Sequence, residues 1–214
     1  MSNQNGRVYG LTLLCPILND VHASPSHDLQ IRAYLAALPT GAESPFAIAS
    51  GTHLARLVVM DDVIYVGAPA HEEHLHSKYL IFEANIDAIG DAGLDSYLTG
   101  LANLASQHLD AIWKHCTGYP GTSNLPDFLS YMKACRIETT FFFAATNDKS
   151  VPETLTALQT QRAMADFIVK HQGMAAAELQ RRFIDFASKL STAPVPPPAM
   201  ATHRRDIQTG GRNE

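Results

Sequence analysis

The sequence predicts an α+β fold built around an antiparallel sheet. Two observations carry this prediction. Between residues 8 and 146, the hydrophobic pattern changes repeatedly between the two-residue period of a strand and the three- to four-residue spacing of a helix. The chain has 214 residues, of which 46% are hydrophobic and 17% are charged, as is usual for a globular domain with additional segments.

The first half of the chain predicts three strands and one helix. Residues 8–17 are apolar and β-branched and predict the first strand. A helix over residues 26–38 follows, with Ser26 as its N-cap, and the Pro-Thr-Gly sequence after it ends the helix. Residues 53–60 and 78–86 predict the second and third strands.

The second half predicts a long helix, a short helix, a fourth strand and two final helices. The long helix carries apolar side chains at three- and four-residue steps: Leu94, Tyr97, Leu98, Leu101, Leu104, Ala105, Leu109, Ile112 and Cys116. Residues 126–135 predict the short helix, and the aromatic and β-branched residues 136–145 predict the strand. Residues 152–171 and 175–190 predict the last two helices, separated at a Gln-Gly pair.

Residues 8–146 therefore read β-α-β-β-α-β, which is the ferredoxin-like order. Such a unit covers one face of its sheet with two helices and leaves the other face for the last two helices or for a second chain. The polar residues 1–6 and the Pro-rich residues 191–214 are predicted to be disordered, so the folded domain is expected to span residues 7–190.

The face turned away from the two helices is expected to be mixed in character. Because side chains alternate along a strand, six polar or aromatic side chains are predicted to point toward this face. They are Thr12, Tyr79, Glu83, Asn85, Thr140 and Phe142. This mixture is typical of the wall of a wet pocket or of an interface, and the alternative is an ordinary half-solvated sheet.

Composition excludes two classes of partner. The net charge is -5 and there is no basic block, so the electrostatic attraction that dominates nucleic-acid binding is missing and we expect no nucleic-acid partner. No apolar run approaches the roughly 20 residues of a membrane helix, so we expect no membrane span.

The cysteines point to the cytoplasm. Cys15, Cys116 and Cys135 are widely spaced in a chain long enough to bury a core, and they do not resemble a disulfide framework. Arg7 and the apolar residues after it offer an alternative interpretation as a weak secretory signal. Pro16 interrupts that stretch, and a first strand explains it better.

Two groups of histidines are candidate ligands. Residues 71–76 contain three histidines and two glutamates, which could hold zinc or a similar metal, although an exposed polar loop is the simpler interpretation. His108 and His115 fall within the apolar stripe of the long helix, where an imidazole needs a hydrogen bond, a charged partner or a ligand such as haem iron.

Three segments together resemble a known family. They are residues 53–59 (His-Leu-Ala-Arg-Leu-Val-Val), residues 78–87 (Lys-Tyr-Leu-Ile-Phe-Glu-Ala-Asn-Ile-Asp) and residues 113–122 (Trp-Lys-His-Cys-Thr-Gly-Tyr-Pro-Gly-Thr). They resemble a poorly characterised ferredoxin-like family that occurs free-standing and beside catalase-like haem and lipoxygenase-type modules. More remotely, the order of elements resembles the dimeric α+β barrels, which include dye-decolourising peroxidases and chlorite dismutases.

The resemblance carries over to four residues. His53 and Arg56 match the family's His-x-Ala-Arg pattern, and Asn85 and Asp87 match its Asn-x-Asp pattern. Alanines at 84 and 88 replace the family's serine and glycine. The barrel resemblance implies a homodimer that pairs the open faces of two sheets around haem or a small organic substrate.

We therefore hypothesise a small-molecule-binding protein with peroxidase-like, haem-dependent oxidative activity on an apolar or lipid-like substrate. Arg56 would orient an anionic group, and Asp87 or Glu83 would act as the acid or base. His53 or His108 would ligate the haem iron, with Asn85 also assigned to cofactor binding.

Two alternatives remain at the sequence level. The first is a non-catalytic, dimeric binding or assembly module that serves a partner enzyme. The second is a metal-dependent enzyme that uses His71, His74 and His76.

Overall fold

The computed structural model describes residues 3–63, 67–68 and 74–198, and it confirms an α+β architecture with an antiparallel sheet. The strands are β1 (Gln4–Asn5), β2 (Val8–Pro16), β3 (Thr52–Met60) and β4 (Tyr79–Asp87). The helices are α1 (His27–Ala36), α2 (Pro45–Ile48), α3 (Gly90–Trp113), α4 (Leu125–Ala134), α5 (Val151–Lys170) and α6 (Ala176–Ser191). No helix in the described ranges is long and apolar enough to cross a membrane.

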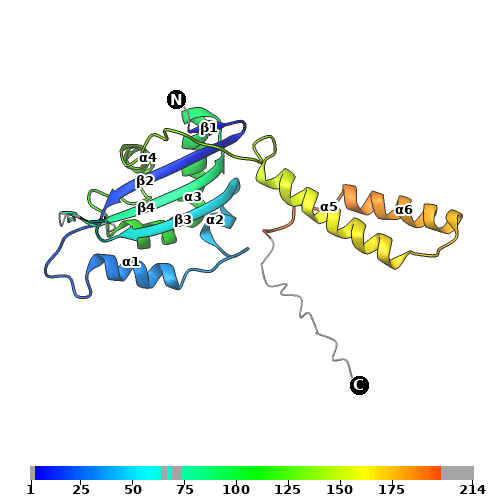
Figure 1. The fold of residues 1–214 in the computed structure, drawn as a ribbon, viewed down its shortest axis with the longest axis horizontal. Helices are drawn as coiled ribbons and strands as arrows, with labels where there is room; N and C mark the ends of the chain where they lie inside the picture. Colours follow the sequence, from blue (N-terminus) through cyan, green and yellow to red (C-terminus); the bar gives the residue numbers. More distant parts are fainter. Residues whose placement is uncertain (1–2, 64–66, 69–73, 199–214) are drawn as a thin grey trace, which may run out of the picture.

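The sheet has the strand order β1-β2-β4-β3, and every neighbouring pair is antiparallel (Figure 1). β2 pairs with β4 along its whole length, from Val8 opposite Asp87 to Pro16 opposite Tyr79. β3 pairs with the other edge of β4 and shifts register at His53. This shift is a β-bulge, which turns a side chain away from its regular alternation.

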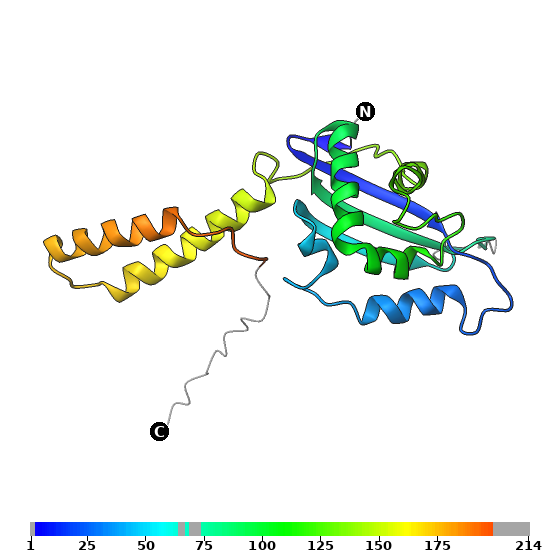
Figure 2. The same ribbon diagram turned by 180° about the vertical axis from the view of Figure 1, so that it is seen from behind.

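One face of the sheet is packed against helices. Figure 2 shows α3 and α4 in front of this face, and α1 contacts α3 and β3. The ring of Phe82 in β4 stacks on Phe46 at 5.4 Å between ring centroids and meets the edge of Trp113 at 5.6 Å. The alternate side chains of β4 predicted to face the helices are all buried: Leu80, Phe82, Ala84 and Ile86.

The prediction of a strand over residues 136–145 is wrong. This segment forms one isolated bridge, between Arg136 and Leu13, and Ile137 N donates to Thr12 O at 2.9 Å. Beyond it, the β2 edge is already occupied, because Gly10 N donates to Asn3 O at 2.7 Å. Residues 137–145 therefore run along the outer side of β1 and do not form a continuous ladder of β-sheet hydrogen bonds.

The first residues differ from the predicted disorder. Asn3 is buried, and Gln4–Asn5 form β1, which pairs with β2 through a turn at Gly6. Gly6 has a φ of +60°, and a side chain there would collide with the Asn147 carbonyl. A polar segment thus takes the edge position that the sequence pattern assigns to the aromatic one.

The last two helices form an antiparallel hairpin, but they do not cover the open face. Figures 1 and 2 both show α5 and α6 projecting away from the sheet. A capping box begins α5, in which Ser150 Oγ accepts from Glu153 N and the Glu153 carboxylate accepts from Ser150 N. After α6, residues 195–198 return to line a cavity with Phe46 and Pro152, whereas residues 199–214 of the predicted tail lie outside the described ranges.

Candidate functional site

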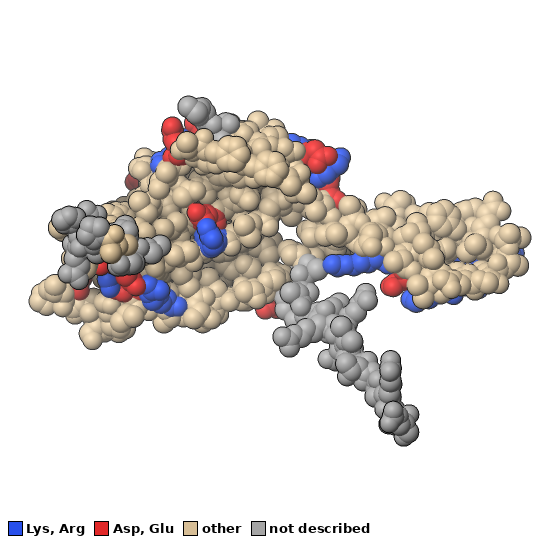
Figure 3. Space-filling view, viewed as in Figure 1, with Lys and Arg blue, Asp and Glu red and all other residues tan. Residues whose placement is uncertain are grey.

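The face of the sheet opposite the helices has no described helix in front of it (Figure 1). Figure 3 shows that this face is largely uncharged, with one adjoining pair of basic and acidic groups near its middle. Leu54 is 60% exposed and Val58 is 42% exposed, and both lie on this face of β3. We call the side chains of β2, β3 and β4 on this side the open face. Exposed aliphatic side chains around an isolated ion pair are typical of a contact surface.

Arg56 and Glu83, both predicted catalytic residues, form an ion pair on the open face. The strand register places them opposite each other, and Arg56 Nε donates to Glu83 Oε2 at 2.8 Å. Such an exposed pair contributes little to stability. The two groups satisfy each other, so Arg56 is not held ready for an anion. Asn85 also lies on the open face, between Gly10 and Leu54.

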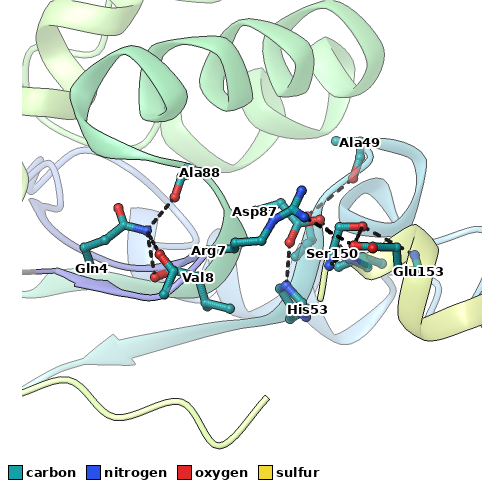
Figure 4. A network of polar contacts seen from close by, with 12 residues as sticks. Gln4, Arg7, Val8, Ala49, His53, Asp87, Ala88, Ser150 and Glu153 are labelled. Atoms are coloured by element: carbon teal, nitrogen blue, oxygen red, sulfur yellow. Dashed lines mark hydrogen bonds and ion pairs between the residues drawn. The ribbon is translucent and has the colours of Figure 1, made fainter. Parts of the chain in front are cut away.

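His53 and Asp87 meet at one end of the sheet. His53 Nε2 lies 2.7 Å from Asp87 Oδ1, and Asp87 Oδ2 accepts a hydrogen bond from Val151 N at 2.8 Å (Figure 4). Val151 begins α5, where a carboxylate is favoured by the helix dipole. The same geometry suits an acid/base pair, yet both Asp87 oxygens already join β4 to β3 and to α5.

A cavity of about 460 Å³ adjoins Asp87. It lies between the connection from α2 to β3, the first half of α3 and the start of α5. On α3, the lining residue Gly100 leaves the space open, since no described atom lies within 4 Å of a Cβ built there. Gly93 instead allows a close approach of the backbone, because a Cβ at that position would lie 3.1 Å from Ala88. The volume falls within the range of small-molecule sites.

Three polar residues that line this cavity, Tyr97, Arg7 and Ser150, have protein partners. The Tyr97 hydroxyl lies 3.0 Å from Thr52 Oγ1, and burial raises the pKa of Tyr97 to about 12. Arg7 Nη1 lies 3.5 Å from Glu153 Oε2, and the same carboxylate accepts from Ser150. A ligand could therefore bind in the cavity through its shape, and its polar groups could replace the present partners of Tyr97 and Arg7. Because its pKa is raised, Tyr97 remains protonated at neutral pH.

His108 lies on the helical side of the sheet. Its Nδ1 is 2.8 Å from the Tyr34 hydroxyl, which joins α3 to α1. His53, by contrast, lies beside Asp87 in the strand layer. The two histidines assigned to haem therefore do not converge on one site, and haem binding stays a prediction.

His115, a candidate ligand in the sequence analysis, has a histidine partner that sequence reasoning missed. His27 Nδ1 and His115 Nδ1 lie 2.8 Å apart, and His115 is buried. Burial, followed by the charges of Lys114 and His27, lowers the pKa of His115. One Nδ1 donates to the other, so this pair joins the start of α1 to the segment just after α3. His27 follows a helix cap in the sequence, and nothing there signals a partner 88 residues away.

The three cysteines also converge, although their spacing does not suggest it. Leu14 N donates to Cys135 O at 2.9 Å, and the backbone of Cys116 bridges that of Ile17, so both cysteines flank Cys15. None of the three forms a disulfide. The neighbouring Cys116 thiol, together with burial, raises the pKa of Cys15 to about 12. Such a protonated, buried thiol is unreactive.

The histidine-rich loop is described only in part. His74 Nδ1 lies 2.6 Å from Asp62 Oδ2, and this hydrogen bond is the main cause that lowers the pKa of Asp62 to about 2. His71 lies outside the described residues. Among the described residues, no three His, Cys, Asp or Glu side chains are grouped to hold a metal.

Comparison with known proteins does not assign a family. No family model matches the chain, and the searches of curated proteins and of solved structures return no significant match.

Proposed function

We propose that the protein is a non-catalytic binding and assembly module that forms a homodimer through its open face and serves a partner enzyme. The observation that carries the proposal is the combination of exposed Leu54 and Val58 with the self-contained Arg56–Glu83 pair. Apolar side chains gain free energy when a second copy covers them, and an internally paired charge pair enters the interface without requiring a counter-charge.

The finer architecture belongs to the same proposal. We propose that the β2-β4-β3 order, with the Arg136–Leu13 bridge beside β2, represents a ferredoxin-like unit whose fourth strand is only initiated. Beyond the bridge, Phe141 and Phe143 are strongly exposed, while Phe142 lies against Gly10 on the open face. Two exposed phenylalanines beside an uncovered sheet support the assignment of this region to an interface.

The dimer is tested by measuring mass in solution. Val58→Lys places a charge on the open face, and we expect it to halve the mass measured by light scattering at protein concentrations below the micromolar range. Leu29→Lys is the matched control, because Leu29 is an exposed aliphatic residue on α1, away from the open face. An unchanged mass for Val58→Lys, with circular dichroism unchanged, would rule out the open face as an interface.

The cavity beside Asp87 favours a second candidate function, the binding of a small molecule. Its support is the volume of about 460 Å³ together with the empty space at Gly100. Native mass spectrometry of the purified protein tests it. We expect a bound compound that Gly100→Leu removes and Asn103→Leu, on the exposed side of α3, retains. A wild-type protein that carries no compound, or a compound retained by Gly100→Leu, contradicts this function.

The haem-dependent version requires its own test. Titration of the protein with hemin should produce a Soret shift that His53→Ala or His108→Ala removes, if either imidazole ligates iron. A spectrum identical to that of hemin alone removes the oxidative proposal and leaves the assembly module.

A further inference from the structure

The α5–α6 hairpin carries an apolar groove that no other described part of the chain covers. The groove is lined mainly by Met164, Phe167 and Ile168 of α5 and by Leu179 and Phe183 of α6. It has a volume of about 550 Å³ and lies at the end of the hairpin that points away from the sheet (Figure 1). Among the described residues that line it, none is Asp, Glu, Lys or Arg.

The two helices already form a seam with each other. Leu179, Phe183, Phe186 and Leu190 follow one another at steps of four, three and four residues, which is the spacing of a paired helix. In that seam, Phe167 stacks on Phe186 at 4.7 Å and contacts Phe183 at 5.8 Å between ring centroids. This single apolar seam is sufficient for two helices to pack against each other.

The apolar stripe extends beyond the seam. Ile168 follows Phe167 and is 55% exposed, and Ile184 follows Phe183 and is also exposed. A stripe of this width is typical of helices in a bundle of more than two. Since Figures 1 and 2 show the hairpin projecting from the sheet, no other described helix of this chain completes such a bundle.

We propose that the groove binds the same groove of a second copy, so that two hairpins form a four-helix bundle. The absence of Asp, Glu, Lys and Arg from the described lining of the groove favours a second copy as the occupant. Glu178 pairs with both Arg181 and Arg182, the latter at 2.9 Å, and Asp185 pairs with Lys189 at 2.7 Å, so each of these charged side chains of α6 has a partner within the helix. An uncharged groove offers no counter-charge to a charged peptide or a lipid headgroup, whereas two copies meet without like-charge repulsion.

The apolar area available on the hairpin is smaller than that of a standard interface. Ile168, Leu179, Phe183 and Ile184 together leave on the order of 300 Å² of apolar surface uncovered. A standard interface buries about 800 Å² per partner, slightly more than half of it apolar. The hairpin therefore provides about two thirds of the apolar area of a standard interface, and we expect a concentration-dependent dimer with a micromolar dissociation constant.

Sedimentation velocity of the full chain tests this contact separately from the open face. The background is Val58→Lys, in which association through the open face is removed. We expect this protein to associate reversibly as its concentration rises through the micromolar range. Ile168→Lys in the same background should weaken that association at least tenfold. Val169→Lys should leave it unchanged, because Val169 is an exposed apolar residue of α5 that does not line the groove.

The outcomes distinguish the two interfaces. A Val58→Lys protein that stays monomeric at every concentration overturns the hairpin contact and leaves the open-face dimer standing. If Val58→Lys keeps the wild-type mass and Ile168→Lys halves it, the hairpin is the interface and the proposed function fails. Equal association of the Ile168→Lys and Val169→Lys proteins also overturns the hairpin contact. Circular dichroism verifies that the helices persist, and Ile168→Gln replaces Ile168→Lys if they do not.

Discussion

The sheet with α1–α4 and the α5–α6 hairpin are stabilised in different ways. In the first region, Trp113, Phe82 and Phe128 are fully buried in one continuous core. In the second, all of whose residues are described, Phe167 is the one buried side chain and is still 8% exposed. The hairpin has only the aromatic seam around Phe167, supplemented by its capping box and by ion pairs along α6. Such local interactions contribute a few tenths of a kcal/mol to about 1 kcal/mol each, so this region is expected to open first.

The largest expected effect is on the sheet core. Trp113→Ala removes a ring that packs edge-on against Phe82 and donates from Nε1 to Cys15 Sγ at 3.4 Å. We expect a loss of about 3–5 kcal/mol in the free energy of unfolding, measured by urea denaturation. Leu104→Ala, at an exposed position on the same helix, should change it little. Equal losses for both variants would contradict a core centred on Trp113.

The corresponding change in the hairpin should stay local. Phe167→Ala removes the ring that contacts Phe183, Phe186 and His171, and we expect it to destabilise the hairpin by about 3 kcal/mol. Hydrogen exchange should then lose protection across residues 151–191 while Tyr79–Asp87 keeps it. Loss of protection in both regions would show that they unfold as one unit.

Removing an ion pair should cost more stability in the sheet region than in the hairpin. Lys78 Nζ donates to the buried Asp28 at 2.7 Å. Burial acts to raise the pKa of Asp28, but hydrogen bonds from Lys78 and Ser26 hold it below its usual value. Lys78→Met leaves that carboxylate buried, and we expect a cost of about 1–3 kcal/mol in chemical denaturation. Lys189→Met, in an exposed pair with Asp185, should cost less than about 0.5 kcal/mol. Equal costs would contradict the distinction.

The smallest expected effect is a pH dependence confined to the sheet region. The pKa of His115 is lowered in the folded state, so the unfolded chain binds a proton first as the pH falls below about 6.5. Stability is therefore full above that pH and decreases as the pH falls toward the lowered value. Thermal unfolding at a series of pH values measures it. His115→Gln should reduce the slope, and an unchanged slope would assign the effect to other groups.

Local pattern predicted the regular elements well. The alternation of β4 identified its buried side, and the three- and four-residue spacing identified α3, because each pattern reports how one element presents its apolar side chains. The pattern failed at residues 136–145. Their β propensity is high, but only one segment can pair with a given part of the β2 edge. Asn3 already occupies that edge, because its carbonyl accepts the hydrogen bond from Gly10 N.

The candidate sites depended on pairings that local pattern does not contain. The sequence predicts site roles for His53 and Asp87 separately, whereas their contact, and the hydrogen bond from Val151 to Asp87, follow from the sheet register and from the position of α5. The sequence also predicts separate chemical roles for Arg56 and Glu83, whereas the strand register makes them partners. The meeting of Cys15 with Cys116 and Cys135 had no local signal at all.

Composition and periodicity were sufficient to predict the mixed fold and most of its helices and strands, because short-range sterics and one-sided apolar stripes are properties of each segment alone. The choice of which segment occupies the β2 edge, the uncovered state of the open face and the projection of the hairpin came from packing. They depend on competition among distant segments for the same hydrogen bonds and the same apolar surface, and that competition exists only once the chain is folded.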